Sequence, residues 1–357
     1  MTVVDADAHI NEDVIAWKGL FAKRPDWIGA VQSGDKMVAL VDGKPYPLQE
    51  GPGRGVPIDS AILPAAAEGA SNLDKRIADC DAEGIDVQVL YGGLTIGLTG
   101  YGDVGLAADV ARAYNDWLLV DVCGRYPDRL KGVATVPLQD VERSIEELQY
   151  AAANGAVAVT IPPALGQRNL DDPSLRPFFE AAADVDLAIG VHSAPGMNIP
   201  LPAAERFSNY AQVHLLSFPV DQMVAFTALA LGGVLDEFPT LRFAFLEAGV
   251  GWAPYFLARA EEHRIKRAEM VPGMTSAARE YVERGQCYFS VECEDPFLEF
   301  YVEQLGPDSV VFASDYPHWD ADFPGTVEEM RQTASKLGEE TAAKVMGGNA
   351  LRLYGLS

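Results

Sequence analysis

The sequence predicts an α/β protein folded as a single (β/α)8 barrel, the TIM-barrel architecture. Short runs rich in β-branched residues alternate with longer segments of helical periodicity, which is the pattern of parallel βα units. Eight such strands can be counted along the chain, the number that closes a barrel. The rival is a doubly wound open sheet. It is disfavoured because no strand is followed by a Gly-rich turn of the dinucleotide or phosphate-loop type.

The elements follow one another in a regular order. The expected strands are residues 2–6, 86–91, 130–137, 156–162, 187–192, 241–247, 287–291 and 309–313. The expected helices are residues 71–83, 107–124, 141–154, 174–185, 220–235, 252–270 and 297–304. C-terminal helices begin at Glu328. No internal repeat or linker divides the chain, so residues 1–357 are expected to form one domain.

Residues 22–70 do not fit the βα repeat, because they are rich in Gly and Pro. Within them, Asp42-Gly43 separates two apolar runs, residues 37–41 and 44–47, and Asp-Gly in that setting is a two-residue hairpin signal. We therefore expect an insertion after the first strand that contains a hairpin and lies over the mouth of the barrel.

The charge balance excludes some classes of partner. The chain has 27 Lys and Arg against 52 Asp and Glu, a formal net charge of −25. Nucleic acid and anionic membrane surfaces would meet a negative field, so neither is expected as a partner. No apolar run reaches 18 residues, and the longest, residues 223–235, is expected to be a buried helix. The N-terminus lacks the features of a secretory signal, and the four cysteines are scattered, so a cytoplasmic location is expected.

Polar side chains close four of the predicted strands. Asp7 and His9 end the first, His192 ends the fifth, Glu247 ends the sixth and Asp315 follows the eighth. Catalytic residues of a (β/α)8 barrel lie at the carboxyl ends of its strands. Three carboxylates there would repel one another, and a cation would neutralise them. The pattern predicts one divalent metal ion, with zinc favoured and manganese, iron(II) and magnesium as alternatives.

Further residues are candidates for the pocket around this centre. His318 follows the Asp315 turn and is expected to bind substrate or support the metal ligands. His214 and, in the long loop after His192, Arg206 and Phe207 are candidate substrate-binding residues. Trp252, which follows the glycine-containing turn after Glu247, completes this set.

The chain resembles the amidohydrolase superfamily, in the amidohydrolase-related branch that includes aminocarboxymuconate-semialdehyde decarboxylase and the resorcylate decarboxylases. The matching segments are residues 4–9 with Glu12, residues 84–91, 115–117, 238–242, 246–252, 314–318 and 348–354. The resemblance places Asp7, His9, His192 and Asp315 on the metal-ligand positions. At the sixth strand, Glu247 stands where these decarboxylases carry a catalytic His. The resemblance also implies a homodimer.

The resemblance implies a metal-dependent enzyme acting on a small molecule. The expected reaction is the non-oxidative decarboxylation of a small aromatic or unsaturated carboxylic acid, with Asp315, Glu247 and His318 as catalytic residues. The alternative is hydrolysis of an amide, ester or lactone by a metal-activated water, with Asp315 accepting the proton. A hydratase and a non-catalytic barrel are further alternatives.

Overall fold

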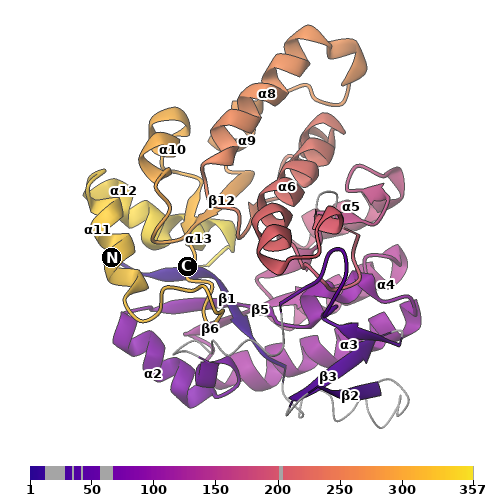
Figure 1. Cartoon of the computed structure of the whole chain (residues 1–357). Helices are drawn as coiled ribbons and strands as arrows, with labels where there is room; N and C mark the ends of the chain where they lie inside the picture. Colours follow the sequence, from indigo (N-terminus) through magenta and orange to yellow (C-terminus); the bar gives the residue numbers. More distant parts are fainter. Residues whose placement is uncertain (13–28, 34–35, 42, 57–66, 201–203, 357) are drawn as a thin grey trace.

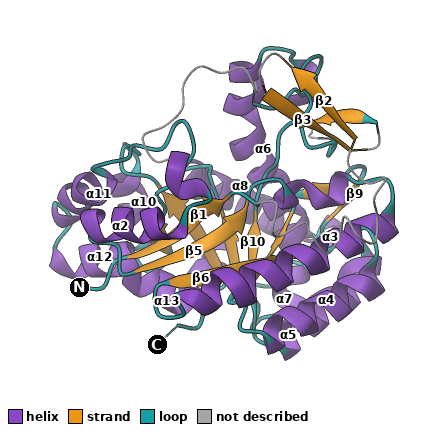
Figure 2. Cartoon of the chain, turned by 90° about the horizontal axis from the view of Figure 1, so that it is seen from below, coloured by secondary structure: helices purple, strands orange, loops and turns teal. Residues whose placement is uncertain are grey.

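Eight parallel strands form the centre of the protein. This computed structural model describes residues 1–12, 29–33, 36–41, 43–56, 67–200 and 204–356. The strands pair in chain order, every hydrogen-bonded pair is parallel, and helices surround them (Figures 1 and 2). The barrel strands are β1 (Val4–Ile10), β5 (Val87–Gly92), β6 (Leu130–Thr135), β7 (Ala158–Ile161), β10 (Ala188–Val191), β11 (Phe243–Phe245), β12 (Cys287–Val291) and β13 (Val310–Phe312). The predicted (β/α)8 barrel is confirmed.

The first and last strands meet at the end of the barrel where the predicted site residues lie. The amide of Asp315 donates to the carbonyl oxygen of Asp7 at 3.1 Å. The amide of His9 donates to the carbonyl oxygen of Tyr316 at 2.6 Å. The two backbone hydrogen bonds therefore join β1 to the segment after β13 and fix Asp7, His9 and Asp315 relative to one another.

Three helices around the first barrel strands begin at a side chain that caps them. Asn72, Asp103 and Asp140 each accept a hydrogen bond from the amide three residues later, which satisfies one of the free donors at a helix start. The helices are α2 (Leu73–Glu83), α3 (Val104–Asp116), α4 (Val141–Ala153), α5 (Arg176–Asp184), α6 (Tyr210–Leu231), α7 (Val234–Glu237), α8 (Trp252–Lys266), α9 (Ala278–Glu283), α10 (Leu298–Leu305), α11 (Thr326–Ser335), α12 (Glu339–Ala343) and α13 (Asn349–Leu353). The C-terminal helices are confirmed.

Aromatic side chains fill the layer between the barrel and α8. The rings of Phe245 and Phe289 are stacked with centroids 5.4 Å apart, and Trp252 lies edge-on to them at 5.9 and 5.5 Å. Trp252 therefore belongs to the hydrophobic core, and it is not among the residues that line the pocket. The prediction that it binds substrate is wrong, because the start of α8 turns its indole outward from the barrel into this layer.

Several elements differ from their predicted bounds; β1, expected over residues 2–6, runs from Val4 to Ile10. Two further differences have clear local reasons. Helix α6 begins at Tyr210 instead of residue 220, because Pro219 is accommodated inside it although proline usually interrupts a helix. It ends at Leu231, and α7 follows after Gly233, whose φ is +84°. Strand β11 stops at Phe245, before Glu247, whose φ is +51° and leaves the extended conformation.

The insertion after β1 carries a small antiparallel sheet. It consists of β2 (Gly29–Ser33), β3 (Lys36–Val41) and β4 (Lys44–Tyr46), and Val41 pairs with Lys44 across the predicted hairpin. Asp42 and the rest of the insertion, residues 22–28, 34–35 and 57–66, lie outside the described residues. Figure 2 shows the small sheet standing apart from the barrel strands. Pro47 and Val56 line the pocket, so the insertion does lie over the barrel mouth.

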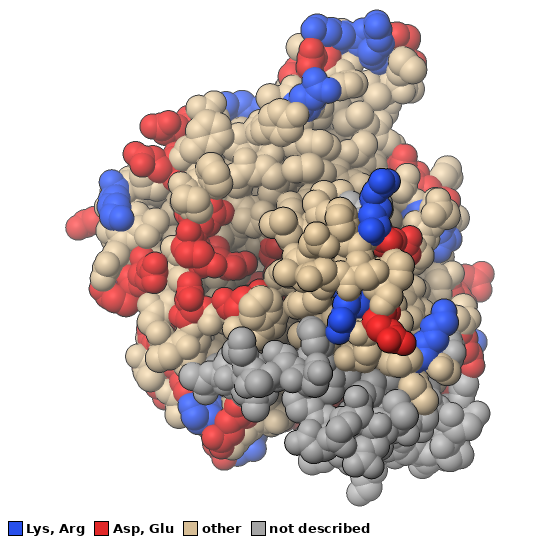
Figure 3. All heavy atoms as spheres, viewed as in Figure 1, with Lys and Arg blue, Asp and Glu red and all other residues tan. Residues whose placement is uncertain are grey.

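One helix among the described residues is long and apolar enough to cross a membrane. It is α6, with 22 residues, and 56% of its most apolar window is buried inside the protein. Its buried side chains pack against the barrel, as those of a core helix do. On the surface, Figure 3 shows acidic side chains gathered on one part of the face, beside a broad uncharged stretch.

Candidate metal centre and pocket

Five predicted side chains converge at the carboxyl ends of the barrel strands. The Nε2 atom of His9 lies 3.6 Å from Oδ1 of Asp7, 3.4 Å from Oδ1 of Asp315 and 3.9 Å from Oε1 of Glu247. The Nε2 atom of His192 lies 3.7 Å from Oδ2 of Asp7 and 3.2 Å from Oε2 of Glu247. Ligands that sit about 2.0–2.2 Å from one ion are spaced in this way.

Backbone carbonyl groups fix both imidazoles in the form that can bind a metal. Nδ1 of His9 lies 3.2 Å from the carbonyl oxygen of Gly92, and Nδ1 of His192 lies 2.7 Å from that of Ser193. A carbonyl oxygen only accepts, so each Nδ1 carries the proton and each Nε2 presents its lone pair to the cluster. Burial lowers the pKa of His192 to about 4 and lowers that of His9 well below its ordinary value, which keeps both rings neutral.

The polar atoms that face the centre of this cluster are buried and have no hydrogen-bond partner. They are both carboxylate oxygens of Asp7, Nε2 of His9, Nε2 of His192 and Oε2 of Glu247. Leaving buried polar atoms unpaired is costly, and so many in one place call for a ligand. All are electron-pair donors, so a divalent cation fits the donor set.

The raised pKa values of two carboxyl groups also indicate a cation at this site. Burial raises the pKa of Asp7 well above its ordinary value, and the negative charge of Asp315 raises it further. Burial, followed by the charge of Asp315, likewise raises the pKa of Glu247. A cation among these groups would reverse both effects, because it favours the ionised forms.

Two of the carboxylates are held by strained backbone. Glu247 and Asp315 have φ of +51° and +52°, in the left-handed region that residues other than glycine rarely adopt. The amide of Glu247 donates to Oγ of Ser290 on β12 at 3.0 Å, which supports this conformation. Strained residues of this kind gather at functional sites, where the surrounding structure holds them.

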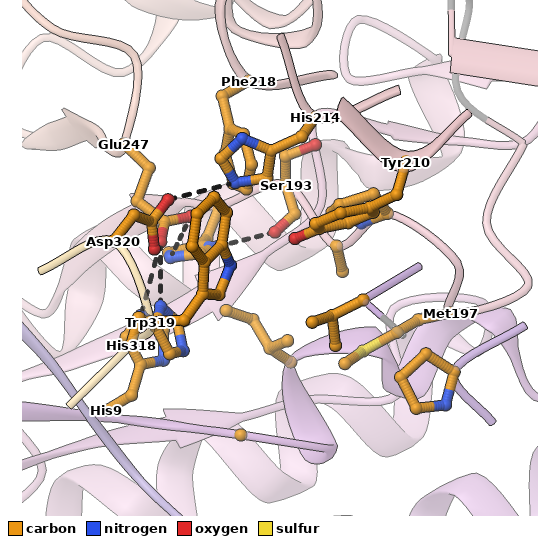
Figure 4. A pocket seen from close by; sticks show the side chains of 17 residues that line it. His9, Ser193, Met197, Tyr210, His214, Phe218, Glu247, His318, Trp319 and Asp320 are labelled. Carbon is orange, nitrogen blue, oxygen red and sulfur yellow. Dashed lines mark hydrogen bonds and ion pairs between the residues drawn. The ribbon is translucent and has the colours of Figure 1, made fainter. Parts of the chain in front are cut away.

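His318 lies beside the metal cluster, against two of its carboxylates. Its Nδ1 lies 2.7 and 2.8 Å from the two carboxylate oxygens of Asp315 and 3.4 Å from Oε1 of Glu247. Its ring stacks on His9 with centroids 4.1 Å apart. Burial would lower the pKa of His318, but the two carboxylates outweigh it and raise the pKa well above its ordinary value. The sixth strand therefore offers a carboxylate, and the loop after β13 brings a cationic imidazole beside it (Figure 4).

A pocket of about 580 Å³, open solvent included, leads from the surface to His9, His192, Glu247 and His318. Of the other predicted substrate-binding residues, His214 lines it. Sequence reasoning missed most of the remaining wall, which is Ile96, Ser193, Met197, Tyr210, Phe218, Trp319 and Asp320 among others.

Two predicted pocket residues lie elsewhere. Arg206 ends a short 3-10 turn and is exposed, and it does not line the pocket. Phe207 packs against a small apolar cluster that includes Ile96 and Val213, and it does not line the pocket itself. Both predictions are wrong, because α6 begins at Tyr210 and takes up the wall that the loop was expected to form.

The comparison with known families agrees with this geometry. The amidohydrolase family matches residues 4–356, nearly the whole chain. This chain belongs to the amidohydrolase family. Membership confirms the predicted resemblance and supports a divalent metal ion in the cluster described above.

Curated proteins similar to this chain include decarboxylases and, over a shorter span, a hydratase. The 2-keto-4-carboxy-3-hexenedioate hydratase of Sphingobium sp. (strain NBRC 103272 / SYK-6) is 28% identical over 44% of this chain and 46% of its own length. The 2-amino-3-carboxymuconate-6-semialdehyde decarboxylase of Dictyostelium discoideum is 27% identical over 79% of this chain and 76% of its own length. The gamma-resorcylate decarboxylase of Rhizobium sp. (strain MTP-10005) is 27% identical over 79% of this chain and 87% of its own.

A solved structure shows the same fold. The dihydroxybenzoic acid decarboxylase of Polaromonas sp. JS666, solved with bound manganese and the inhibitor 2-nitroresorcinol, superposes with a TM-score of 0.72 at 19% identity. The match covers 99% of this chain and 97% of that one.

Proposed function

We propose that this protein is a metal-dependent decarboxylase, which converts a small aromatic or unsaturated carboxylic acid into carbon dioxide and a product with hydrogen in place of the carboxyl group. The observation that carries the proposal is the cluster of unpaired donor atoms beside His318, at the base of a largely apolar pocket. The named activities of the curated relatives support it. The expected homodimer and cytoplasmic location stay predictions.

Asp7, His9, His192 and Asp315 would hold the metal ion, with Glu247 beside them. When bound, the ion supplies positive charge that attracts the substrate carboxylate and stabilises negative charge as it develops. Imidazole and carboxylate ligands together suit zinc or manganese better than magnesium. We include these two metals in the proposal, and the manganese in the Polaromonas structure supports the second.

The residues of this chain then deliver the proton. The carboxylates of Asp315 and Glu247 hold Nδ1 of His318 and keep its ring cationic, and the opposite nitrogen, Nε2, donates its proton to the ring carbon that bears the carboxyl group. The bond between that carbon and the carboxyl carbon breaks, its electron pair returns to the ring, and carbon dioxide leaves. Overall, one substrate carboxylate and one proton are converted into one product with hydrogen in place of the carboxyl group and one molecule of carbon dioxide. No oxidation or reduction takes place.

The experiment measures carbon dioxide release from a set of hydroxybenzoic acids by metal-loaded protein. In heavy water we expect one deuterium at the carbon that loses the carboxyl group. Asp315→Asn should abolish release while the protein stays folded by circular dichroism. The hydrolase alternative predicts cleavage of amides, esters or lactones and no carbon dioxide, and that result would contradict the proposal.

A further inference from the structure

A second polar group lies in the pocket, away from the metal ligands. Nε2 of His214, on α6, lies 3.4 Å from Oδ2 of Asp320, in the loop after β13. Tyr210 and Trp319 flank the pair, with ring centroids 5.4 and 5.6 Å from that of His214. We call these four residues the outer cluster. All four line the pocket.

One aromatic ring separates the outer cluster from the metal centre. The rings of His192 and Phe218 have centroids 6.3 Å apart, and those of Phe218 and His214 are 5.0 Å apart. Figure 4 shows Phe218 and His214 close together, with Tyr210 beside them and Trp319 facing across the pocket. A flat ring lying against Phe218 would therefore have one edge toward His192 and the other toward His214.

The charge at the outer cluster restricts which substituent the substrate ring can have on the edge that faces His214. Among the lining residues that the structure describes, none is Lys or Arg, the cationic His318 is already paired with Asp315 and Glu247, and Glu247 and Asp320 are both acidic. A second carboxylate on the substrate would meet Asp320 without a cation to pair with, and like charges in a partly desolvated pocket repel. A hydroxyl group has no such penalty, because it can donate to the carboxylate of Asp320.

We propose that His214 and Asp320 form a subsite for a hydroxyl group on the substrate ring, on the side away from the carboxyl group that is removed, and that they exclude a second carboxylate there. The inference rests on the proposed function for the orientation of the substrate. It narrows the substrate class to monocarboxylic aromatic acids with a hydroxyl group on the far edge of the ring. His214 positions the carboxylate of Asp320, and this carboxylate accepts a hydrogen bond from the hydroxyl group of the substrate.

Three ligands that differ only opposite the carboxyl group test this subsite. They are 2,4-dihydroxybenzoate, 2-hydroxy-4-methoxybenzoate and 2-hydroxyterephthalate, and calorimetry gives the dissociation constant of each with metal-loaded protein. We expect the dihydroxy compound to bind about tenfold more tightly than the methoxy compound, the size of one hydrogen bond to a charged group. The dicarboxylate should bind more weakly than both.

Two variants of Asp320 separate its hydrogen bond to the substrate hydroxyl group from its repulsion of a second carboxylate. Asp320→Leu removes the acceptor, so the dihydroxy and methoxy compounds should bind equally. Asp320→Asn keeps an acceptor but removes the charge, so the dicarboxylate should gain about tenfold while part of the hydroxyl preference remains. Leu215→Ala is the matched control, because Leu215 is next to His214 but 73% exposed and outside the pocket.

Equal dissociation constants of the three ligands for the unaltered protein would overturn the proposed subsite. So would an Asp320→Leu variant that keeps the same order of the three dissociation constants. Failure of the proposed decarboxylase function would give a different result from failure of the subsite. No ligand would then release carbon dioxide, although the ranking of dissociation constants would remain.

Discussion

The side-chain amide of Gln222 holds the carbonyl oxygen of Val191 at 2.8 Å, and the same nitrogen lies 2.9 Å from the carbonyl oxygen of Leu246. Gln222 is fully buried on α6, and the two carbonyl groups precede His192 and Glu247. One amide thus links the ends of β10 and β11 directly below two site residues. It sets the spacing between Nε2 of His192 and Oε2 of Glu247, which is 3.2 Å.

Replacing Gln222 with Leu should therefore weaken metal binding. Residues that orient metal ligands typically change affinity by about 10–100-fold when mutated, and we expect a loss of this size by competitive chelator titration. Gln286→Leu is the matched control, because the buried amide of Gln286 also donates to two carbonyl oxygens, those of Leu235 and Phe238, outside the site. Both variants should lose stability. An equal loss of metal affinity in both would show that Gln222 has only a structural role.

The buried carboxyl group of Asp221 should make stability depend on pH. Its carboxylate accepts a hydrogen bond from the hydroxyl of Ser193, and burial raises its pKa to about 7 from 3.8. Between about pH 4 and pH 7 the folded protein holds a proton that the unfolded chain releases, so the contribution of this group to stability falls as the pH rises through that window. Asp221→Asn removes this dependence, and its stability relative to the unaltered protein should rise by about 1–4 kcal/mol from pH 4 to pH 8.

Urea unfolding of the metal-free protein at both pH values checks this, with Asp236→Asn as the control, because the pKa of Asp236 shifts in the opposite direction. Burial would raise the pKa of Asp236, but hydrogen bonds from Ser276 and Tyr281 outweigh it and lower the pKa. That carboxylate contributes its full stability above its unfolded pKa of about 4 and loses it only at lower pH, so the cost of Asp236→Asn should be nearly the same at pH 4 and pH 8. Parallel trends in the two variants would contradict the assignment.

The metal centre could be predicted from the sequence because it depends on strand ends. Asp7 and His9 lie in β1, His192 and Asp315 follow the ends of β10 and β13, and the barrel topology brings such positions together. The chemistry of His318 was harder to foresee. Its contact with Glu247 depends on the path of the loop after β13, which local sequence does not determine.

The pocket wall could be predicted only in part. Tyr210, His214 and Phe218 are spaced by four residues, the period of one helix face, but Pro219 made a helix over them look unfavourable. Trp319 and Asp320 lie in an irregular loop whose position is set by tertiary contacts. The hydrogen bonds of Gln222 join segments more than twenty residues apart, so no local sequence pattern predicts them.

One metal ion should bind per chain, at the cluster that contains Asp7. Metal that binds only the folded state stabilises it, by about 4 kcal/mol at a thousandfold excess over the dissociation constant. We expect zinc or manganese to raise the melting temperature of the metal-free protein, and Asp7→Asn to lose most of that gain. The control is Asp322→Asn, in a second, more exposed group with Cys293 and Glu294. A stoichiometry of two that falls to one in Asp322→Asn would refute the single-site prediction.

Replacing His318 with Gln should separate chemistry from binding. The variant keeps a hydrogen-bond donor near Asp315 but has no titratable proton, and loss of a general acid typically costs about 10²–10⁴-fold in rate. We expect kcat to fall by that factor, while the dissociation constant of substrate changes little, because the wall formed by Phe218, His214 and Trp319 is intact. His263→Gln controls for loss of an imidazole, since His263 lies on α8 outside the pocket. Steady-state rates, together with deuterium incorporation into the product, check this. If kcat were unchanged in His318→Gln, the proton donor would be another residue, and Glu247, 3.4 Å from Nδ1 of His318, would be the next candidate.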